Sequence, residues 1–491
     1  MSLTPDTRFF GHPRGLSTLF FTELWERFGY YGMRALLILF MTASVETGGL
    51  GIEDSQAYGI YGLYIAMVYL LSLPGGWLAD RVLGQQRTVL YGGMLIAVGY
   101  LMLAVPSKGV FFAGLAVVAI GTGLLKPNIS TIVGQIYTPE DRRRDSGFSI
   151  FYMGINLGAL LAPLVCGPLG TGVSWQLGFG LAGLGMVVGV FTFAAGRKHL
   201  GEAGLHPVPV SSPEEAGQIR QYLRNGILAL VGVPLVLAAL HVSGVVTVTL
   251  EGLVDGSGFV LLLAVIVLFA WMFLGAEWTV EERKRLGVIA VLFFASSLFW
   301  SAFEQAGSSL NIFAARYTDN QLFGMSLSAT VYQSLNPIYI IVLAPVFAWL
   351  WIRLGPKQPA SPAKFSLGLI FVGLGFVVMM MAAMKAGTDG KVSPLWLTGC
   401  YALHTIGELC LSPVGLSAFT KLAPARVAGL MMGVWFLSIS TGNYLGGRLA
   451  AFYGELPIQD LFQTTATFAI VAGLILAVVA RPVARMMGSL R

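Results

Sequence analysis

Long apolar runs, separated by short polar segments, recur along the whole chain. A helix needs about 20 predominantly apolar residues to cross a bilayer, and most runs reach that length. The runs do not alternate between apolar and polar positions, which argues against a membrane β-barrel. The pattern therefore predicts fourteen membrane-spanning helices, near residues 16–44, 56–80, 88–106, 110–137, 147–169, 174–196, 222–242, 258–277, 288–315, 325–352, 365–384, 394–420, 427–450 and 463–483.

The composition agrees with this pattern. Only 11% of the 491 residues are charged, whereas soluble domains carry about 25%. Backbone groups in lipid must be paired internally, so the spans are expected to be helices, and the 62 glycines fit their close packing. The sequence thus predicts an all-α polytopic membrane protein, in which three cysteines are expected to be buried thiols: Cys166, Cys400 and Cys410.

The basic residues predict the orientation. If the N-terminus is cytoplasmic, alternate loops collect most of the 30 Lys and Arg residues, as the positive-inside rule requires. Both termini are therefore expected in the cytoplasm. The net charge of +6 reflects this topology, so no nucleic-acid partner is predicted. Four basic residues fall within spans instead: Arg27, Arg34, Lys126 and Arg448.

A weak internal repeat divides the chain. Residues 74–84 resemble residues 345–355, Glu26 corresponds to Glu304, and Lys126 corresponds to Ser412. Internal repeats with a binding site between them near the membrane midplane are typical of transporters.

The repeat predicts three parts. A six-helix bundle is expected over residues 1–196 and a second one over 286–491. The segment 197–285 lies between them, and its two additional spans are expected beside the bundle, away from the transport path.

The first predicted span carries an ionisable stripe within TELWERFGYYGMR. At 100° per residue, its polar side chains fall within an arc of about 140°. Glu23 and Arg27 have the i, i+4 spacing of an ion pair. A charge at mid-bilayer costs at least about 2.5–3.5 kcal/mol. Together with Lys126, Glu304 and Glu408, the stripe predicts a wet cavity, with a buried structural ion-pair network as the alternative.

Several motifs resemble the proton-coupled oligopeptide transporter family of the major facilitator superfamily, in its bacterial form. Glu23 to Gly32 carry an ExxERF–YYG pattern that is similar to the family's first helix. The stretches GGWLADRVLGQQRTV, FYMGINLGA, FWSAFEQ and GELCLSPVG resemble further family segments, in the same order. The resemblance implies a major facilitator fold with two six-helix bundles and two inserted helices. It also implies a proton-coupled symporter that imports di- and tripeptides by alternating access and functions as a monomer in the inner membrane.

The resemblance also implies a peptide site. Arg34 and Lys126 would bind the peptide carboxylate, and Glu408 would pair with the amino group. Further binding positions carried over from the family are Asn156, Asn336, Tyr30, Tyr69, Trp300, Trp435 and Ser412. Each amide or aromatic side chain could instead serve helix packing or anchoring at the membrane interface.

Proton coupling would need carboxylates whose cationic partner changes between states. We expect Glu23 and Glu26 to act beside Arg27, and Glu304 to face Lys126. Span 56–80 has no histidine, so a histidine relay there is excluded. His404 lies one helical turn before Glu408, and a packing role is favoured for it.

Other classes of function fit less well. The sequence has no HExxH pair and no GxSxG elbow, so no enzyme, metal or cofactor is predicted. A channel would need repeated rings of like charge or a filter loop. A carrier of another small anion or zwitterion, or a peptide sensor that does not transport, stays open.

Overall fold

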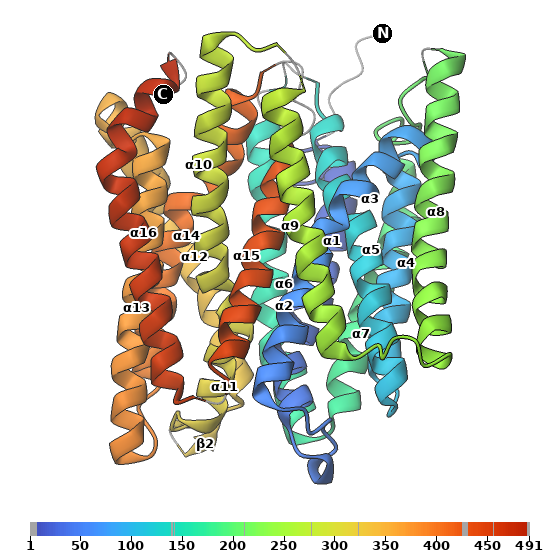
Figure 1. The fold of residues 1–491 in the computed structure, drawn as a ribbon. Coiled ribbons are helices and arrows are strands. Elements are labelled where there is room, and N and C mark those ends of the chain that lie inside the picture. Colours follow the sequence, from blue (N-terminus) through green and yellow to red (C-terminus); the bar gives the residue numbers. More distant parts are fainter. Residues whose placement is uncertain are drawn as a thin grey trace.

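The structure is a computed structural model that describes residues 7–138, 141, 143–210, 212–275, 277–322, 324–424, 431–454 and 456–488. The chain forms an elongated bundle of roughly parallel and antiparallel helices (Figure 1). Its first part contains α1 (Arg14–Thr42), α2 (Asp54–Leu70), α3 (Ser72–Leu78), α4 (Gln85–Leu103), α5 (Lys108–Gln135), α6 (Arg144–Gly172), α7 (Trp175–Gly196), α8 (Pro213–Val242) and α9 (Leu250–Leu274).

The second part is also helical, apart from one small hairpin in which β1 (Gln321–Leu322) pairs antiparallel with β2 (Met325–Ser326). A 3-10 turn, η4 (Glu304–Gly307), follows α10, and another, η5 (Ala329–Ser334), precedes α12. The helices are α10 (Val280–Phe303), α11 (Ser309–Arg316), α12 (Leu335–Leu354), α13 (Ser361–Asp389), α14 (Leu395–Leu422), α15 (Met431–Phe452) and α16 (Ile458–Met486).

The predicted spans coincide with these helices, and the all-α membrane architecture is confirmed. Ten helical segments within the described residues are long and apolar enough to cross a membrane. Three predicted spans differ in detail. The span 56–80 divides into α2, α3 and a π-helical turn, and 288–315 divides at η4. The span 325–352 begins with β2 and η5, so its helix α12 starts at Leu335. The first residues of the predicted span 427–450 lie outside the described residues.

Glycines allow the closest helix contacts. α2 and α15 cross where a Cβ on Gly447 would lie 2.6 Å from the Cα of Gly62. At the same crossing, the Ser440 hydroxyl donates a hydrogen bond to the Ala66 carbonyl at 2.8 Å. Small residues that bring two backbones together are the usual basis of helix association in membranes. This crossing joins a helix of the first predicted bundle to one of the second.

The two additional helices lie at the side of the bundle. α8 buries none of its residues and stands at the edge of the molecule (Figure 1). Its first turn contacts the π-helical turn after α3, where Arg81 Nη1 lies 2.6 Å from Glu215 Oε1. α9 packs against α2, α10 and α15. The position beside the bundle is the one expected, while the domain boundaries stay a prediction.

Candidate functional site

The ionisable stripe of α1 is buried. Glu23, Glu26 and Arg27 are all less than 5% exposed. Arg27 Nε lies 3.2 Å from Glu23 Oε1, which is the i, i+4 pair expected, and it also hydrogen-bonds Glu26. One cation therefore serves two carboxylates. Among the described residues, one oxygen of each carboxylate lacks a hydrogen-bond partner.

Arg34, two turns further along α1, pairs with Glu304. Its Nη2 lies 2.8 Å from Glu304 Oε2, an ionic contact rather than a well-aligned hydrogen bond. Its Nε donates a hydrogen bond of 2.8 Å to the hydroxyl of Tyr61. Both partners in the ion pair are buried. The pair connects α1 with the segment that follows α10, so it joins positions far apart in the sequence.

In this structure the ion pair of Glu304 is with Arg34, and the expected role of Glu304 opposite Lys126 stays a prediction. α10 ends at Phe303, and Glu304 begins the 3-10 turn η4, which packs against α1. Gly307, at the end of this turn, lies so close that an added Cβ would be 1.9 Å from the Tyr61 hydroxyl and 2.7 Å from Arg34 Nε. The missing side chain at Gly307 lets the turn approach α1 and brings Glu304 to Arg34.

Lys126 has a different environment. It is half-buried in the middle of α5, one residue before Pro127. Its Nζ lies 3.7 Å from the centroid of the Tyr69 ring, a cation–π contact. No carboxylate of the described residues lies within ion-pair distance of it. Within the described residues, the contact with Tyr69 is thus the polar environment that the structure gives Lys126, and its role in binding stays a prediction.

Glu408 is, like Lys126, an ionisable residue within a predicted span, and it lies half-buried on α14. The Asn336 side chain donates hydrogen bonds to Glu408 Oε2 at 2.8 Å and to the Thr405 hydroxyl at 3.1 Å. Among the described residues, Glu408 has no cationic partner, although the amide of Asn336 orients it. Ser412 follows one turn later on the same helix and is half-buried as well.

The remaining predicted binding residues fall into two groups. Asn156 is buried and donates to the Tyr152 carbonyl at 2.9 Å, within its own helix α6. Tyr30, Trp300 and Trp435 are buried aromatic side chains, and Trp435 packs edge-on against Phe419. In this structure these residues are packed, and their use in binding stays a prediction.

A small cavity marks the centre of the site. It measures about 20 Å³ and is lined by residues of α1, α10, η4, η5, α12 and α14. That volume holds about one water molecule. Its lining residues are Tyr31, Arg34, Phe303, Ala306, Gln333, Asn336, Tyr401 and His404. In this conformation the cavity has no room for a ligand larger than a water molecule.

Gln333, which lines the cavity, and Tyr61, which contacts Arg34, were not predicted as site residues. Gln333 is buried, and within the described residues neither its amide oxygen nor its amide nitrogen has a hydrogen-bond partner. It lies three residues before Asn336, and this spacing, which places two side chains on the same helical face, could have indicated it from the sequence. Tyr61, which binds Arg34, lies in a YxxYxxY run that resembles ordinary packing.

His404 is a packed side chain, in agreement with the favoured role. Its ring lies 4.9 Å from Phe376, and its Nε2 is 3.5 Å from the Cys400 sulfur. No group of potential metal ligands occurs among the described residues.

The ends of the bundle carry further polar contacts. Arg316 at the end of α11 binds Asp54 at the start of α2, with Nη2 2.8 Å from Oδ1. At the opposite end, Asp80 accepts a hydrogen bond of 2.9 Å from Gln85. The first contact closes the bundle beside the hairpin β1–β2.

Comparison with known proteins identifies the family. The family model described as POT family matches residues 86–467. A relative from Yersinia enterocolitica subsp. palearctica, the peptide transporter YePEPT, is 41% identical over 503 residues, which cover 99% of this chain and 98% of the relative. A di-/tripeptide transporter of Lactococcus lactis subsp. lactis is 38% identical over 495 residues, covering 98% of each chain.

A solved structure shows the same fold. The crystal structure of a peptide transporter POT in complex with sulfate has a TM-score of 0.93 and 45% sequence identity, and the match covers 98% of this chain and 97% of that one. Fold, motifs and relatives agree over almost the whole length. This chain belongs to the POT family of membrane transporters.

Proposed function

We propose that the protein is a proton-coupled symporter that imports di- and tripeptides across the cytoplasmic membrane by alternating access. The observation that carries the proposal is the set of charges at the centre of the bundle. Arg34 and Glu304 form a closed pair, whereas Lys126 and Glu408 have no ionic partner among the described residues. A zwitterion supplies one charge for each of these two groups.

The peptide termini find complementary groups in this arrangement. Lys126 attracts the carboxylate, and Arg34 adds a bidentate donor when Glu304 releases it. Glu408 binds the peptide's ammonium group, and the Asn336 amide holds the Glu408 carboxylate in place. Asn156 and Ser412 would meet the peptide amide, and Tyr30, Tyr69, Trp300 and Trp435 would form the walls after the bundle opens.

The proton acts on the buried pairs. Protonating Glu304 removes the charge that holds Arg34, so the arginine becomes free for the substrate. Glu23, Glu26 and Arg27 form a second pair network that can respond in the same way. Because Arg34 joins α1 to the segment after α10, releasing it loosens the contact between the two predicted bundles.

The placement in the membrane follows the distribution of basic residues. Both termini are proposed to lie in the cytoplasm, because loops on that side carry most of the lysine and arginine. The end closed by Asp54 and Arg316 is then the outer end. A single chain contains all the groups named above, so a monomer is proposed to suffice.

The charge assignment is tested by competition between peptides with blocked termini. Purified protein in proteoliposomes takes up labelled dialanine in the presence of unlabelled dialanine, dialanine amide or N-acetyl-dialanine. A lost charge contact is expected to weaken competition about tenfold or more. Lys126→Gln should abolish discrimination against the amide, and Glu408→Gln should abolish discrimination against the acetylated peptide.

Glu214→Gln is the control, because Glu214 is exposed in the first turn of α8, a helix that buries none of its residues. It should leave both discriminations intact. If Lys126→Gln and Glu408→Gln also leave them intact, the assignment of the two termini is wrong. If uptake never occurs while peptide still binds, the protein is a sensor and the transport proposal fails.

A further inference from the structure

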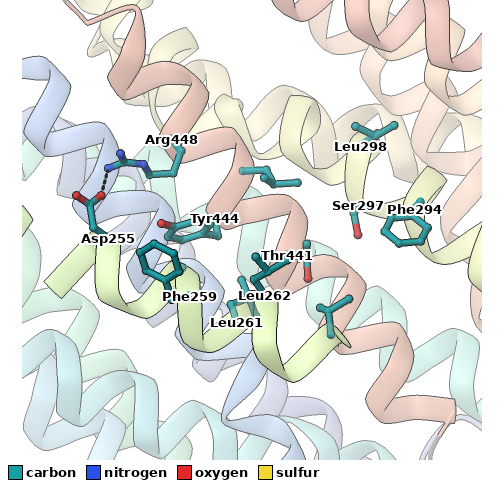
Figure 2. Close-up of a pocket in the computed structure, with 13 residues that line it drawn as sticks. Asp255, Phe259, Leu261, Leu262, Phe294, Ser297, Leu298, Thr441, Tyr444 and Arg448 are labelled. Atoms are coloured by element: carbon teal, nitrogen blue, oxygen red, sulfur yellow. Dashed lines mark ion pairs between the residues drawn. The ribbon is translucent and has the colours of Figure 1, made fainter. Parts of the chain in front are cut away.

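An apolar groove lies on the outside of the bundle, between α9, α10 and α15 (Figure 2). Its volume is about 660 Å³, within the range of about 300–1,000 Å³ that is typical of ligand pockets. Phe259 and Leu262 of α9 face Phe294 and Leu298 of α10, with Leu445 of α15 at the side. The groove shares no lining residue with the central cavity, and one of the two inserted helices, α9, forms one of its walls.

Hydrogen-bonding groups in the groove are satisfied within the protein. The Ser297 hydroxyl donates to the Ser438 carbonyl at 3.0 Å, and the Thr441 hydroxyl donates to Leu437 at 2.8 Å. Tyr444 donates to the Val254 carbonyl at 3.1 Å, which attaches α9 to α15. The groove therefore offers hydrocarbon surface, and a hydrocarbon chain suits it.

One end of the groove is charged. Asp255 Oδ1 and Arg448 Nη1 lie 2.8 Å apart, and their side chains keep 47% and 42% of their surface exposed (Figure 2). Asp255 lies in the second turn of α9, and Arg448 lies one turn before α15 ends at Phe452. Arginine has five N–H donors, so contact with one carboxylate leaves others for an anion. The pair sits near the helix ends, where lipid headgroups lie.

A second cavity continues from this charged end. It measures about 480 Å³ and shares Arg448 with the groove. Polar side chains line it towards the helix ends, among them Gln56 of α2 and Thr249 and Glu251 at the start of α9. Arg448 thus lies between an apolar groove and a cavity of mixed lining that holds polar groups, and an amphipathic ligand could use both.

We infer that these two spaces form a binding site for a phospholipid with an ammonium headgroup, of the phosphatidylethanolamine type. One acyl chain occupies the groove, the phosphate binds Arg448, and the ammonium group lies between Asp255 and Glu251. Two carboxylates and one guanidinium give the site a net negative charge, which disfavours an anionic lipid. A choline group has no N–H to donate, so it forms weaker contacts with the carboxylates.

The first test needs no variant. Delipidated full-length protein is incubated with an equimolar mixture of phosphatidylethanolamine, phosphatidylcholine and phosphatidylglycerol with identical acyl chains, and bound lipids are counted by native mass spectrometry. Two partly exposed charge contacts support a preference of about tenfold for phosphatidylethanolamine. Equal retention of the three lipids, or a preference for phosphatidylglycerol, would overturn the inference.

Two variants locate the site. Asp255→Asn with Arg448→Gln removes both charges together, so it leaves no unpaired ion, and it should abolish the headgroup preference. Leu262→Trp fills the groove and should reduce retention of lipid about tenfold. Ile475→Trp is the matched control, because Ile475 is similarly exposed on α16, outside the groove. A preference that persists in the double variant, or equal losses in Leu262→Trp and Ile475→Trp, would place the lipid elsewhere.

Discussion

At the scale of single residues, the contact between Arg34 and Glu304 determines how the centre is closed. The sequence identified both residues, because ionised side chains within apolar spans are rare and costly. It placed Glu304 opposite Lys126, whereas in this structure Glu304 lies in the 3-10 turn η4 and pairs with Arg34. A helical pattern does not show where a 3-10 turn redirects a side chain.

Glu304→Gln is expected to abolish proton-driven accumulation of peptide. The substitution leaves Arg34 buried without its counter-charge, and breaking a buried pair costs about 3–5 kcal/mol. The thermal unfolding temperature should fall, and peptide exchange without a proton gradient should persist. The unfolding temperature is measured on purified protein, and accumulation and exchange of peptide are measured in proteoliposomes. Accumulation at the wild-type rate would remove Glu304 from the coupling mechanism.

Gly307→Ala tests the close approach of η4 to α1. Its Cβ would lie 1.9 Å from the Tyr61 hydroxyl, so the turn must move away from Arg34. Overpacking of this kind costs about 1–3 kcal/mol. We expect lower thermal stability together with reduced uptake. Gly109→Ala, where a Cβ meets nothing within 4 Å, is the control and should behave as wild type. Equal behaviour of the two variants would show that the turn is not sterically fixed.

At the scale of helices, apolar length predicted the elements well. A membrane helix must be long enough to cross the hydrocarbon core, so its ends are expected where the sequence changes from apolar to polar residues. Partners between helices were not predictable, because glycine contacts such as that of Gly62 with Gly447 have no local sequence signature. Gln333 was missed for the same reason: its neighbours in the cavity come from other helices.

Gly447→Ala is expected to push α15 away from α2. The new methyl group would lie 2.6 Å from the Gly62 backbone, which cannot move aside as a side chain could. We expect a loss of thermal stability of about 1–3 kcal/mol and reduced uptake. Gly399→Ala in α14 has open space around it and serves as the control. A stability equal to that of Gly399→Ala would show that the two helices do not pack this tightly.

The loop between α5 and α6 should not set the pH dependence of transport. Hydrogen bonds from Arg143 lower the pKa of Asp141 to about 2, and Arg143 Nη2 lies 2.7 Å from its Oδ2. With this lowered pKa, the ionised carboxylate of Asp141 keeps its stabilising contact at any pH above the ordinary carboxyl pKa. The contact is lost only as the pH falls through about 2, so Asp141 stays ionised between about pH 5 and 8. Asp141→Asn should therefore keep the pH of half-maximal uptake, as read from initial rates. A shifted midpoint would make this loop part of the proton path.

At the scale of the whole molecule, contacts at one end and in the middle hold the predicted bundles together. Asp54 and Arg316 join them at the end, and Arg34 and Glu304 join them near the centre. The half-buried Lys126 and Glu408 lie on α5 and α14, which belong to different predicted bundles. This distribution fits a carrier whose central site is reached when the two bundles move relative to each other. The weak repeat indicated the two bundles, while their mutual arrangement needed three-dimensional contacts.

The most direct test of proton-coupled import is uptake of labelled dialanine by the purified protein in proteoliposomes with an acidic exterior. Uptake is measured with and without an uncoupler that collapses the proton gradient. The account predicts accumulation above the external concentration and its loss with the uncoupler. Binding without accumulation, or accumulation that survives the uncoupler, would contradict it.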